Sequence, residues 1–214
     1  MTTVAVRGEA VREVDPELAE FTVVVSARDR DRDATLARLR ERSEAFRQFL
    51  ERFGEAVEKR ETSGLHVYPE SSGKRGERIT AYHGSVSTTV TVRDFAALGE
   101  LMLAVAGQEQ TEVRGPFWSV RPDSPVHREA RRAAVRDAIA RAREYAEALG
   151  SELVELVELA DPGLSRAEGI QTFAGGYGGG MMKSQSTPEL QLDPRRQRIS
   201  AAVEARFTMT APAL

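Results

Sequence analysis

Residues 79–92 read Ile-Thr-Ala-Tyr-His-Gly-Ser-Val-Ser-Thr-Thr-Val-Thr-Val, and this stretch decides the fold class. β-Branched residues dominate its second half, and they favour extended backbone because their side chains pack well on a pleated sheet. The stretch is therefore the strongest strand signal in the chain. Asp94 follows it and is placed to cap an amphipathic helix that ends at Gly107. The inward face of this helix is expected to carry Phe95, Leu98, Leu101, Met102 and Val105.

Six further segments have the composition and alternation of strands: residues 3–14, 18–27, 57–68, 113–120, 152–159 and 199–209. Two further helices are predicted. The first begins near Asp31 or Asp33, carries apolar residues at three- and four-residue steps, and stops at Gly54. The second spans residues 126–149, has an alanine-lined face and stops at Gly150. Because alanine is short, that face lets the helix backbone lie close to its neighbour.

The resulting order, ββαββαβαββ, has runs of strands punctuated by helices rather than strict βαβ alternation. It predicts an α+β fold, in which a largely antiparallel sheet carries about three helices packed on one face. The 214 residues are expected to form a single domain, residues 1–214. A two-domain alternative would break near residues 122–126, but each half would then have a small core.

The composition excludes several classes of function. The chain has no cysteine, so disulfides, thiolate metal sites and cysteine nucleophiles are excluded. Its net charge of −3 provides no general attraction to nucleic acid. No apolar run approaches the roughly 20 residues that a membrane-spanning helix needs, and the first residues lack the pattern of a signal peptide. We therefore expect a cytoplasmic protein that neither inserts into a membrane nor binds nucleic acid.

Several stretches resemble, in chain order, the SIMPL-domain family, which includes bacterial oxidative-stress-defence and periplasmic immunogenic proteins. The resemblance covers nearly the whole chain and is carried by order and spacing rather than by a single motif. The matching stretches are Val4-x-Val6-x-Gly8-Glu9-Ala10, Pro16-Glu17-Leu18-Ala19, Thr62-Ser63-Gly64-Leu65, Ile79-Thr80-Ala81-Tyr82, Val90-Thr91-Val92-Arg93-Asp94, Ala134-Val135-x-Asp137-Ala138 and Leu192-Asp193-Pro194.

The resemblance implies a protein without established catalytic residues, and an association with self-assembly and protection against oxidative stress. Two features depart from the family. Arg195 stands where relatives commonly have glycine, and many relatives carry a secretion signal that the start of this chain does not show. The second departure again favours the cytoplasm.

Histidines are the first candidates for metal binding or acid–base chemistry. His66 and His83 are expected on neighbouring strands, where they could approach each other, and His127 is the third. No pair has the spacing of a metal motif, so surface or strand-edge positions are the stronger interpretation.

Two charged groups have a plain structural alternative to a functional role. The carboxylates of Glu9, Asp15 and Glu17 could do acid–base work if held close together, but a solvated hairpin explains them better. A set of arginines could touch phosphate, but acidic residues interleave with them and favour a salt-bridged surface. These arginines are Arg128, Arg131, Arg132, Arg136, Arg141, Arg143, Arg195, Arg196 and Arg198.

Residues 163–189 form the most glycine-rich segment of the chain. The run at residues 175–180 lacks the Gly-Lys-Ser/Thr ending and the strand–helix context of a phosphate-binding loop, and its glycine content favours a flexible loop. Tyr177, Met181 and Met182 place adaptable apolar side chains on this loop. We therefore expect it to contact a second subunit or a partner protein.

The sequence offers no nucleophile–base pair, so no catalytic, cofactor or metal residue is assigned. We expect a non-enzymatic protein that forms a homo-oligomer through sheet edges, the alanine-lined helix or the glycine-rich loop. One alternative is a small-ligand-binding protein or an enzyme with a site between sheet and helices, lined by Tyr82, His83 and Trp118. Another alternative is an accessory subunit of an envelope complex.

Overall fold

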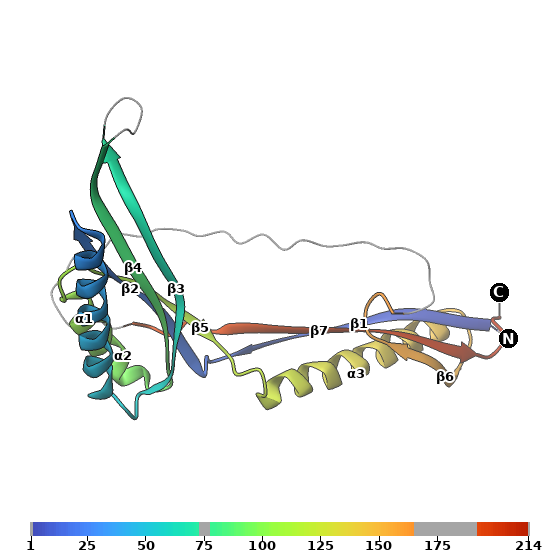
Figure 1. The fold of residues 1–214 in the computed structure, drawn as a ribbon. Helices are drawn as coiled ribbons and strands as arrows, with labels where there is room; N and C mark the ends of the chain where they lie inside the picture. Colours follow the sequence, from blue (N-terminus) through green and yellow to red (C-terminus); the bar gives the residue numbers. More distant parts are fainter. Residues whose placement is uncertain (1, 73–77, 165–191, 214) are drawn as a thin grey trace. The chain divides into compact units, whose positions relative to one another are not determined.

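The computed structural model describes residues 2–72, 78–164 and 192–213, drawn as the coloured ribbon of Figure 1. The predicted element order and the α+β class are confirmed, and all the strand pairings are antiparallel. The strands divide between two sheets, where one shared sheet was expected. In chain order the elements are β1 (Thr2–Val14), β2 (Leu18–Asp29), α1 (Arg32–Glu51), β3 (Val57–Ser72), β4 (Arg78–Val92), α2 (Phe95–Ala106), β5 (Thr111–Ser119), α3 (Pro125–Ala148), β6 (Leu153–Ala160) and β7 (Gln197–Met209).

The chain divides into two compact units, and each contains one of the sheets. The first unit holds β1, α3, β6 and β7, and the second holds β2 to β5 with α1 and α2. The first unit draws on the beginning, the middle and the end of the chain, so no single cut would release it. The expectation that the chain forms a single domain stays a prediction.

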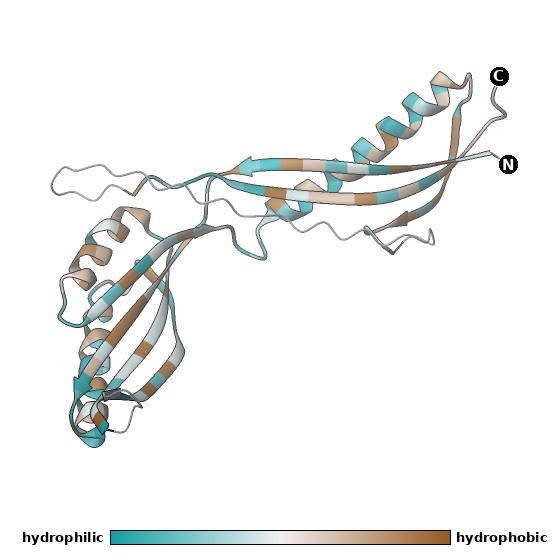
Figure 2. Cartoon of the chain, turned by 90° about the horizontal axis from the view of Figure 1, so that it is seen from above, coloured by the Kyte–Doolittle hydropathy of each residue, from teal (hydrophilic) through white to brown (hydrophobic). Residues whose placement is uncertain are grey.

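In the first unit β7 lies between β1 and β6, and α3 packs on one face of the sheet (Figure 1). The register places Val4 opposite Phe207 and Val6 opposite Ala205, so apolar side chains of both strands share the helix-covered face. Figure 2 shows the resulting alternation of brown and paler bands along the strands. The buried core of this unit consists of Val6, Ala134, Ala138, Ala142, Val203, Ala205 and Phe207.

Gly8 allows α3 to lie directly against β1. A Cβ atom on Gly8 would stand 2.1 Å from the carbonyl oxygen of Ala134 and 2.5 Å from the amide nitrogen of Ala138. Both are backbone atoms, which cannot move aside as a flexible side chain could. Because Ala134 and Ala138 present only methyl groups, the two backbones can approach this closely. The expected close packing of the alanine-lined face is confirmed.

The second unit has the strand order β3-β4-β2-β5, and α1 and α2 cover one face. The register pairs Phe21 with Val90, and β-branched residues of β4 fill the same face. Phe21 and Val90 are fully buried together with Leu98 and Leu101 of α2. β4, the strand with the strongest signal in the sequence, is therefore an interior strand of this sheet. Its β-branched residues pack against those of a neighbouring strand on either side.

The helix ends follow the predicted capping residues at four of five positions, and one of the four is Gly107, directly after α2. The Asp31 carboxylate accepts from the Ala34 amide at 2.8 Å, and the Asp94 carboxylate accepts from the Ala96 amide at 3.0 Å. Gly150 follows α3 with a φ of +64°, a conformation that favours glycine. The predicted stop at Gly54 is wrong, because α1 ends at Glu51 and consecutive tight turns follow it.

Candidate functional site

β6 forms one edge of the three-stranded sheet, and α3 packs on β1 and β7 but barely reaches it. Leu156 lies opposite Phe207, and Leu159 lies opposite Ala205. Both partners belong to the core beneath α3, so both leucines point to the helix side of the sheet. Leu156 at 49% exposure and Leu159 at 48% consequently stay open to solvent on this face. Val154 at 64% and Val157 at 54%, which lie at the two register shifts of the same strand, are also exposed. These four residues are called the β6 patch.

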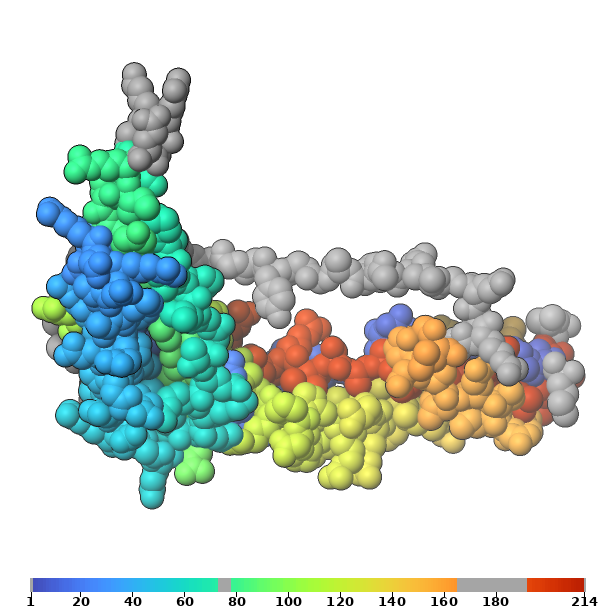
Figure 3. Space-filling model, viewed as in Figure 1, coloured from blue at the N-terminus to red at the C-terminus, as the bar shows by residue number. Residues whose placement is uncertain are grey.

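Two β-bulges shape this strand, one between Leu153 and Glu155 and one between Leu156 and Glu158. Each bulge adds one residue, so leucines three residues apart share a face instead of alternating. A bulged edge is a poor template for adding another strand. The β6 patch therefore suits contact through side chains rather than extension of the sheet. In the view of Figure 3 the side chains of β6, in orange, lie at the surface of the first unit.

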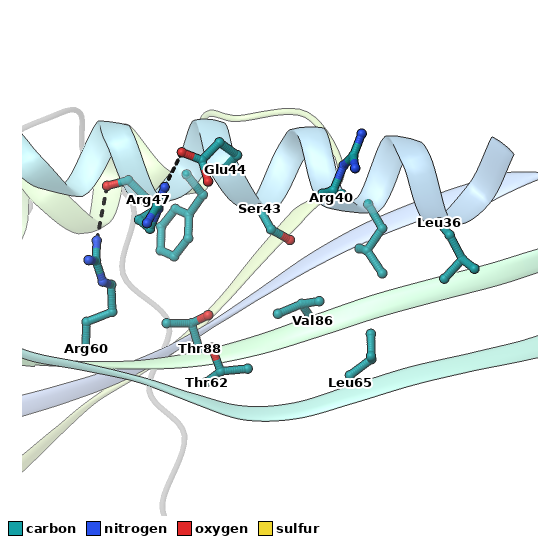
Figure 4. A pocket seen from close by; sticks show the side chains of 12 residues that line it. Leu36, Arg40, Ser43, Glu44, Arg47, Arg60, Thr62, Leu65, Val86 and Thr88 are labelled. Carbon is teal, nitrogen blue, oxygen red and sulfur yellow. Dashed lines mark hydrogen bonds and ion pairs between the residues drawn. The ribbon is translucent and has the colours of Figure 1, made fainter. Parts of the chain in front are cut away.

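The second unit contains a groove between α1 and the strands β3 and β4 (Figure 4). Its volume is about 560 Å³, within the range of about 300–1,000 Å³ typical of small-ligand sites. The groove exists because α1 packs on β2 and β4 and leaves the edge strand β3 uncovered. The groove is lined by Leu36, Leu39, Arg40, Ser43, Glu44, Phe46, Arg47, Arg60, Thr62, Leu65, Val86 and Thr88.

The polarity of the lining changes along the groove. α1 supplies one wall, and the alternating residues of β3 and β4 that face it supply the other. In Figure 4 nine of the labelled side chains form three successive groups along this length: apolar Leu36, Leu65 and Val86, then hydroxyl-bearing Ser43, Thr62 and Thr88, then charged Glu44, Arg47 and Arg60. The tenth, Arg40, lies on α1 between Ser43 and Leu36, beside the apolar group. Apart from Arg40, one end of the groove is therefore hydrocarbon, and the other end is ionic.

The charged end is held by two contacts. Arg60 reaches from β3 to α1, where its guanidinium donates to the carbonyl oxygen of Arg47 at 3.3 Å. The Arg47 guanidinium in turn donates to the Glu44 carboxylate, and this hydrogen bond holds the pKa of Glu44 below its ordinary value. Glu44 is therefore ionised at neutral pH. Arg47 and Arg60 against Glu44 leave this end with a net charge of +1, and Arg40 brings the whole described lining to +2.

Ser43 lies in the wall between the apolar and charged ends. Its Oγ atom is buried and has no hydrogen-bond partner in the part of the chain that the structure describes. A buried polar atom without a partner costs about 1–3 kcal/mol. A polar group in the groove would therefore stabilise the Ser43 hydroxyl by bonding to it, provided that the side chains covering this buried atom shift to admit the group.

The predicted histidines occupy separate environments. His66 and His83 lie on the neighbouring strands β3 and β4, on the face of the sheet that the helices leave open. The His83 ring packs on Tyr68 with 5.1 Å between centroids, and His127 is hydrogen-bonded through Nε2 to the Arg121 carbonyl at 3.0 Å. Within residues 2–72, 78–164 and 192–213, no group of three or more His, Asp or Glu side chains is placed to hold a metal ion.

The residues predicted to line a ligand site do not come together. Tyr82 and His83 are consecutive in β4 and therefore point to opposite faces of the sheet. Trp118 packs edge to face on Phe95 at 4.9 Å, where it contributes to the core. The groove in Figure 4 instead uses α1 and β3, and sequence reasoning missed it. The only signal was the apolar stripe of α1, which indicated a buried face but no cavity.

At least one residue of each predicted charged group takes part in an ion pair. Glu9 pairs with Arg7 at 3.1 Å, and Asp137 pairs with Arg141 one helical turn away at 3.0 Å. The second pair agrees with the interpretation of α3 as a salt-bridged helix.

Two further expectations concern the loop and the membrane. The interaction loop with Tyr177, Met181 and Met182 lies outside the described residues, so it stays a prediction. Among the helices that the structure describes, none is both long and apolar enough to span a bilayer.

Sequence comparison decides the family. The profile of SIMPL, described as a protein of unknown function (DUF541), matches residues 4–207. This chain belongs to the SIMPL family. The match includes strands of both units, from β1 at one end to β7 at the other. The resemblance drawn from the sequence is confirmed, and SIMPL membership itself assigns no activity.

Two relatives of this SIMPL chain are named 26 kDa periplasmic immunogenic protein. They come from Brucella melitensis biotype 1 and Brucella abortus strain S19. Each is 32% identical over 173 residues, which cover 74% of this chain and 66% of the relative, so the chain spans slightly less than two thirds of its relatives' length. Their name contradicts the expected cytoplasmic location, which rested only on the first residues of the chain.

Proposed function

We propose that this SIMPL chain is a non-enzymatic periplasmic protein that self-associates through the β6 patch. The observation that carries the proposal is the set of four half-exposed apolar side chains on one short edge strand. Exposed apolar side chains gathered on one edge strand favour an interaction site, because leaving them in water is unfavourable. The resemblance to the SIMPL-domain family supports self-assembly independently.

A second copy is the occupant that best fits this surface. An apolar surface is complementary to itself, so a two-fold pair of chains buries Leu156 and Leu159 of both copies without another partner. The two bulges direct the contact to the side chains of Leu156 and Leu159 rather than to the backbone edge. A stable interface buries about 800 Å² per partner, so the β6 patch would form its centre and neighbouring polar residues its rim.

Light scattering after gel filtration, over a range of protein concentrations, tests the proposal. We expect a mass at least twice that of the 23.5 kDa chain. The double variant Leu156→Asn with Leu159→Asn should move the mass towards the monomer. Both side chains are about half exposed, so the substitutions should leave the fold intact.

The matched control is Leu103→Asn, because Leu103 is 45% exposed on α2 in the second unit. This variant should keep the mass of the parent protein. A parent chain that is monomeric at all concentrations, or a double variant with unchanged mass, would contradict self-association through β6.

The periplasmic location is supported by the names of the two Brucella relatives. Expression of the complete natural gene in its own host, followed by osmotic release of the periplasm, checks it. We expect the protein in the released fraction together with a periplasmic marker enzyme. Recovery with a cytoplasmic marker would overturn the location and leave the β6 contact untouched.

A further inference from the structure

The groove between α1 and β3 is a site in the second unit, separate from the β6 patch in the first unit. Its apolar end, its free hydroxyl and its cationic end follow one another along α1 (Figure 4). From Leu36 to Arg47 the helix rises about 16 Å, at 1.5 Å per residue. This length and polarity match an extended molecule that is hydrocarbon at one end and negatively charged at the other.

We propose that this groove binds a single-chain amphipathic anion of the fatty-acid type. The acyl chain lies along Leu36, Leu39 and Leu65, and the head group lies between Ser43 and Arg60. Because Glu44 is already occupied by Arg47, its charge does not repel the incoming anion as a free carboxylate would. The Ser43 hydroxyl gains the hydrogen-bond partner that it lacks within the described protein.

Three observations favour this ligand over other small molecules. The net charge of the lining is positive, which disfavours cations. The apolar end is built from aliphatic side chains, and the one aromatic residue of the described lining, Phe46, is only 3% exposed, so it leaves little ring surface on which a base or sugar could stack. The groove is open along its length rather than closed, because β3 is an edge strand and Leu65 is 62% exposed. An open groove accommodates a chain better than a compact polar metabolite.

Calorimetric titration of the full chain with dodecanoate, below its micelle concentration, tests the proposal. Dodecyltrimethylammonium serves as the probe with the same chain and the opposite charge. We expect saturable binding of dodecanoate and at least tenfold weaker binding of the cation. Arg60→Gln should weaken dodecanoate binding about tenfold or more, since a hydrogen bond to a charged group is lost. Arg60→Lys should recover part of that loss.

Further variants separate ligand binding from folding. Leu65→Asn changes an exposed side chain, so it should weaken dodecanoate binding several-fold while the melting temperature stays near that of the parent. Ser43→Ala should weaken binding by a smaller factor. Arg114→Gln is the matched control, because Arg114 is an exposed arginine on β5 of the same sheet, outside the groove. It should bind dodecanoate like the parent.

Several results would overturn the proposal. Equal binding of the two probes would show hydrophobic adsorption rather than anion recognition. Binding seen only above the micelle concentration, or unaffected by both Arg60→Gln and Leu65→Asn, would place the ligand elsewhere. If the parent chain binds an acidic extended peptide, the Leu65→Asn variant binds it more weakly, and neither binds dodecanoate, then the groove is a peptide site instead.

Discussion

At the scale of single residues, the ion pair between Arg28 of β2 and Glu70 of β3 keeps the Glu70 carboxylate ionised. Nε and Nη2 of Arg28 donate to the same Glu70 carboxylate oxygen at 2.9 and 2.7 Å. This hydrogen bonding, followed by the charge of Arg28, lowers the pKa of Glu70, and the charge of His83 adds to the effect. Both residues are accessible to solvent, so the pair contributes little to stability.

Titration of the Glu70 carboxyl by NMR should therefore report a pKa below the ordinary value of about 4.3. Because the folded pKa is lowered, the stabilisation is fully present above the ordinary pKa and is lost as the pH falls through the folded one. Arg28→Gln should move the Glu70 pKa back towards its ordinary value. An unchanged Glu70 pKa in that variant would show that Arg28 does not hold this carboxylate in solution.

At the scale of elements, the contact between α3 and β1 depends on missing side-chain atoms. Gly8→Ala would place a methyl group against the backbone of α3, so the first unit must shift or strain. We expect the free energy of unfolding to fall by about 1–3 kcal/mol, the usual cost of overpacking. Urea unfolding followed by circular dichroism measures this change.

Gly107→Ala is the control for the glycine substitution itself. A Cβ atom on Gly107 would meet its nearest neighbour at 3.5 Å, an ordinary van der Waals contact. Its free energy of unfolding should stay within about 0.5 kcal/mol of the parent. Equal effects of the two substitutions would mean that close packing at Gly8 is not the cause.

The sequence was sufficient for the elements that rest on local signals. The capping residues Asp31 and Asp94 are recognisable because a short acidic side chain satisfies amide groups within its own helix turn. The interior strand β4 is recognisable from its β-branched residues. The end of α1 was not recognisable from the sequence, because several turn conformations compete after the helix and Gly54 is only one of the residues that permit them.

The candidate sites could not be derived because β-bulges alter which residues share a face. In β3 the register shifts between Val57 and Lys59 and again between Thr62 and Gly64, so simple alternation does not place Arg60 and Leu65 on the same face. In β6 the bulges give leucine a three-residue repeat, which matches neither a strand nor a helix period. Bulges depend on the partner strand, and the sequence of one strand does not reveal them.

At the scale of the whole molecule, the division into two sheets was missed because the partners of each strand are distant in the chain. β1 pairs with β7, while β2 begins only four residues after β1 and pairs with β4 and β5. The alternation of residues within β1 or β2 does not determine which distant strand each of them pairs with. The chain passes between the two units several times, and the SIMPL profile extends over both.

This connectivity predicts that the two units unfold as one cooperative domain. The chain has one tryptophan, and Trp118 lies in the second unit, so its fluorescence reports on that unit alone. Gly8→Ala, which acts in the first unit, should nevertheless shift the urea midpoint of the Trp118 signal. A midpoint that stays unchanged while the circular dichroism transition moves would mean that the units are independent domains.

Self-association through the β6 patch has the most direct test in disulfide trapping, because the natural chain contains no cysteine. Single cysteines would be placed at Val154, Leu156, Val157 and Leu159, with Leu103→Cys as a control of similar exposure in the second unit. A disulfide forms only when two Cα atoms lie about 4.4–6.8 Å apart. We predict that at least one β6 position gives a covalent dimer on mild oxidation while Leu103→Cys remains monomeric. If all four positions cross-link no more than Leu103→Cys, the two copies do not meet at β6.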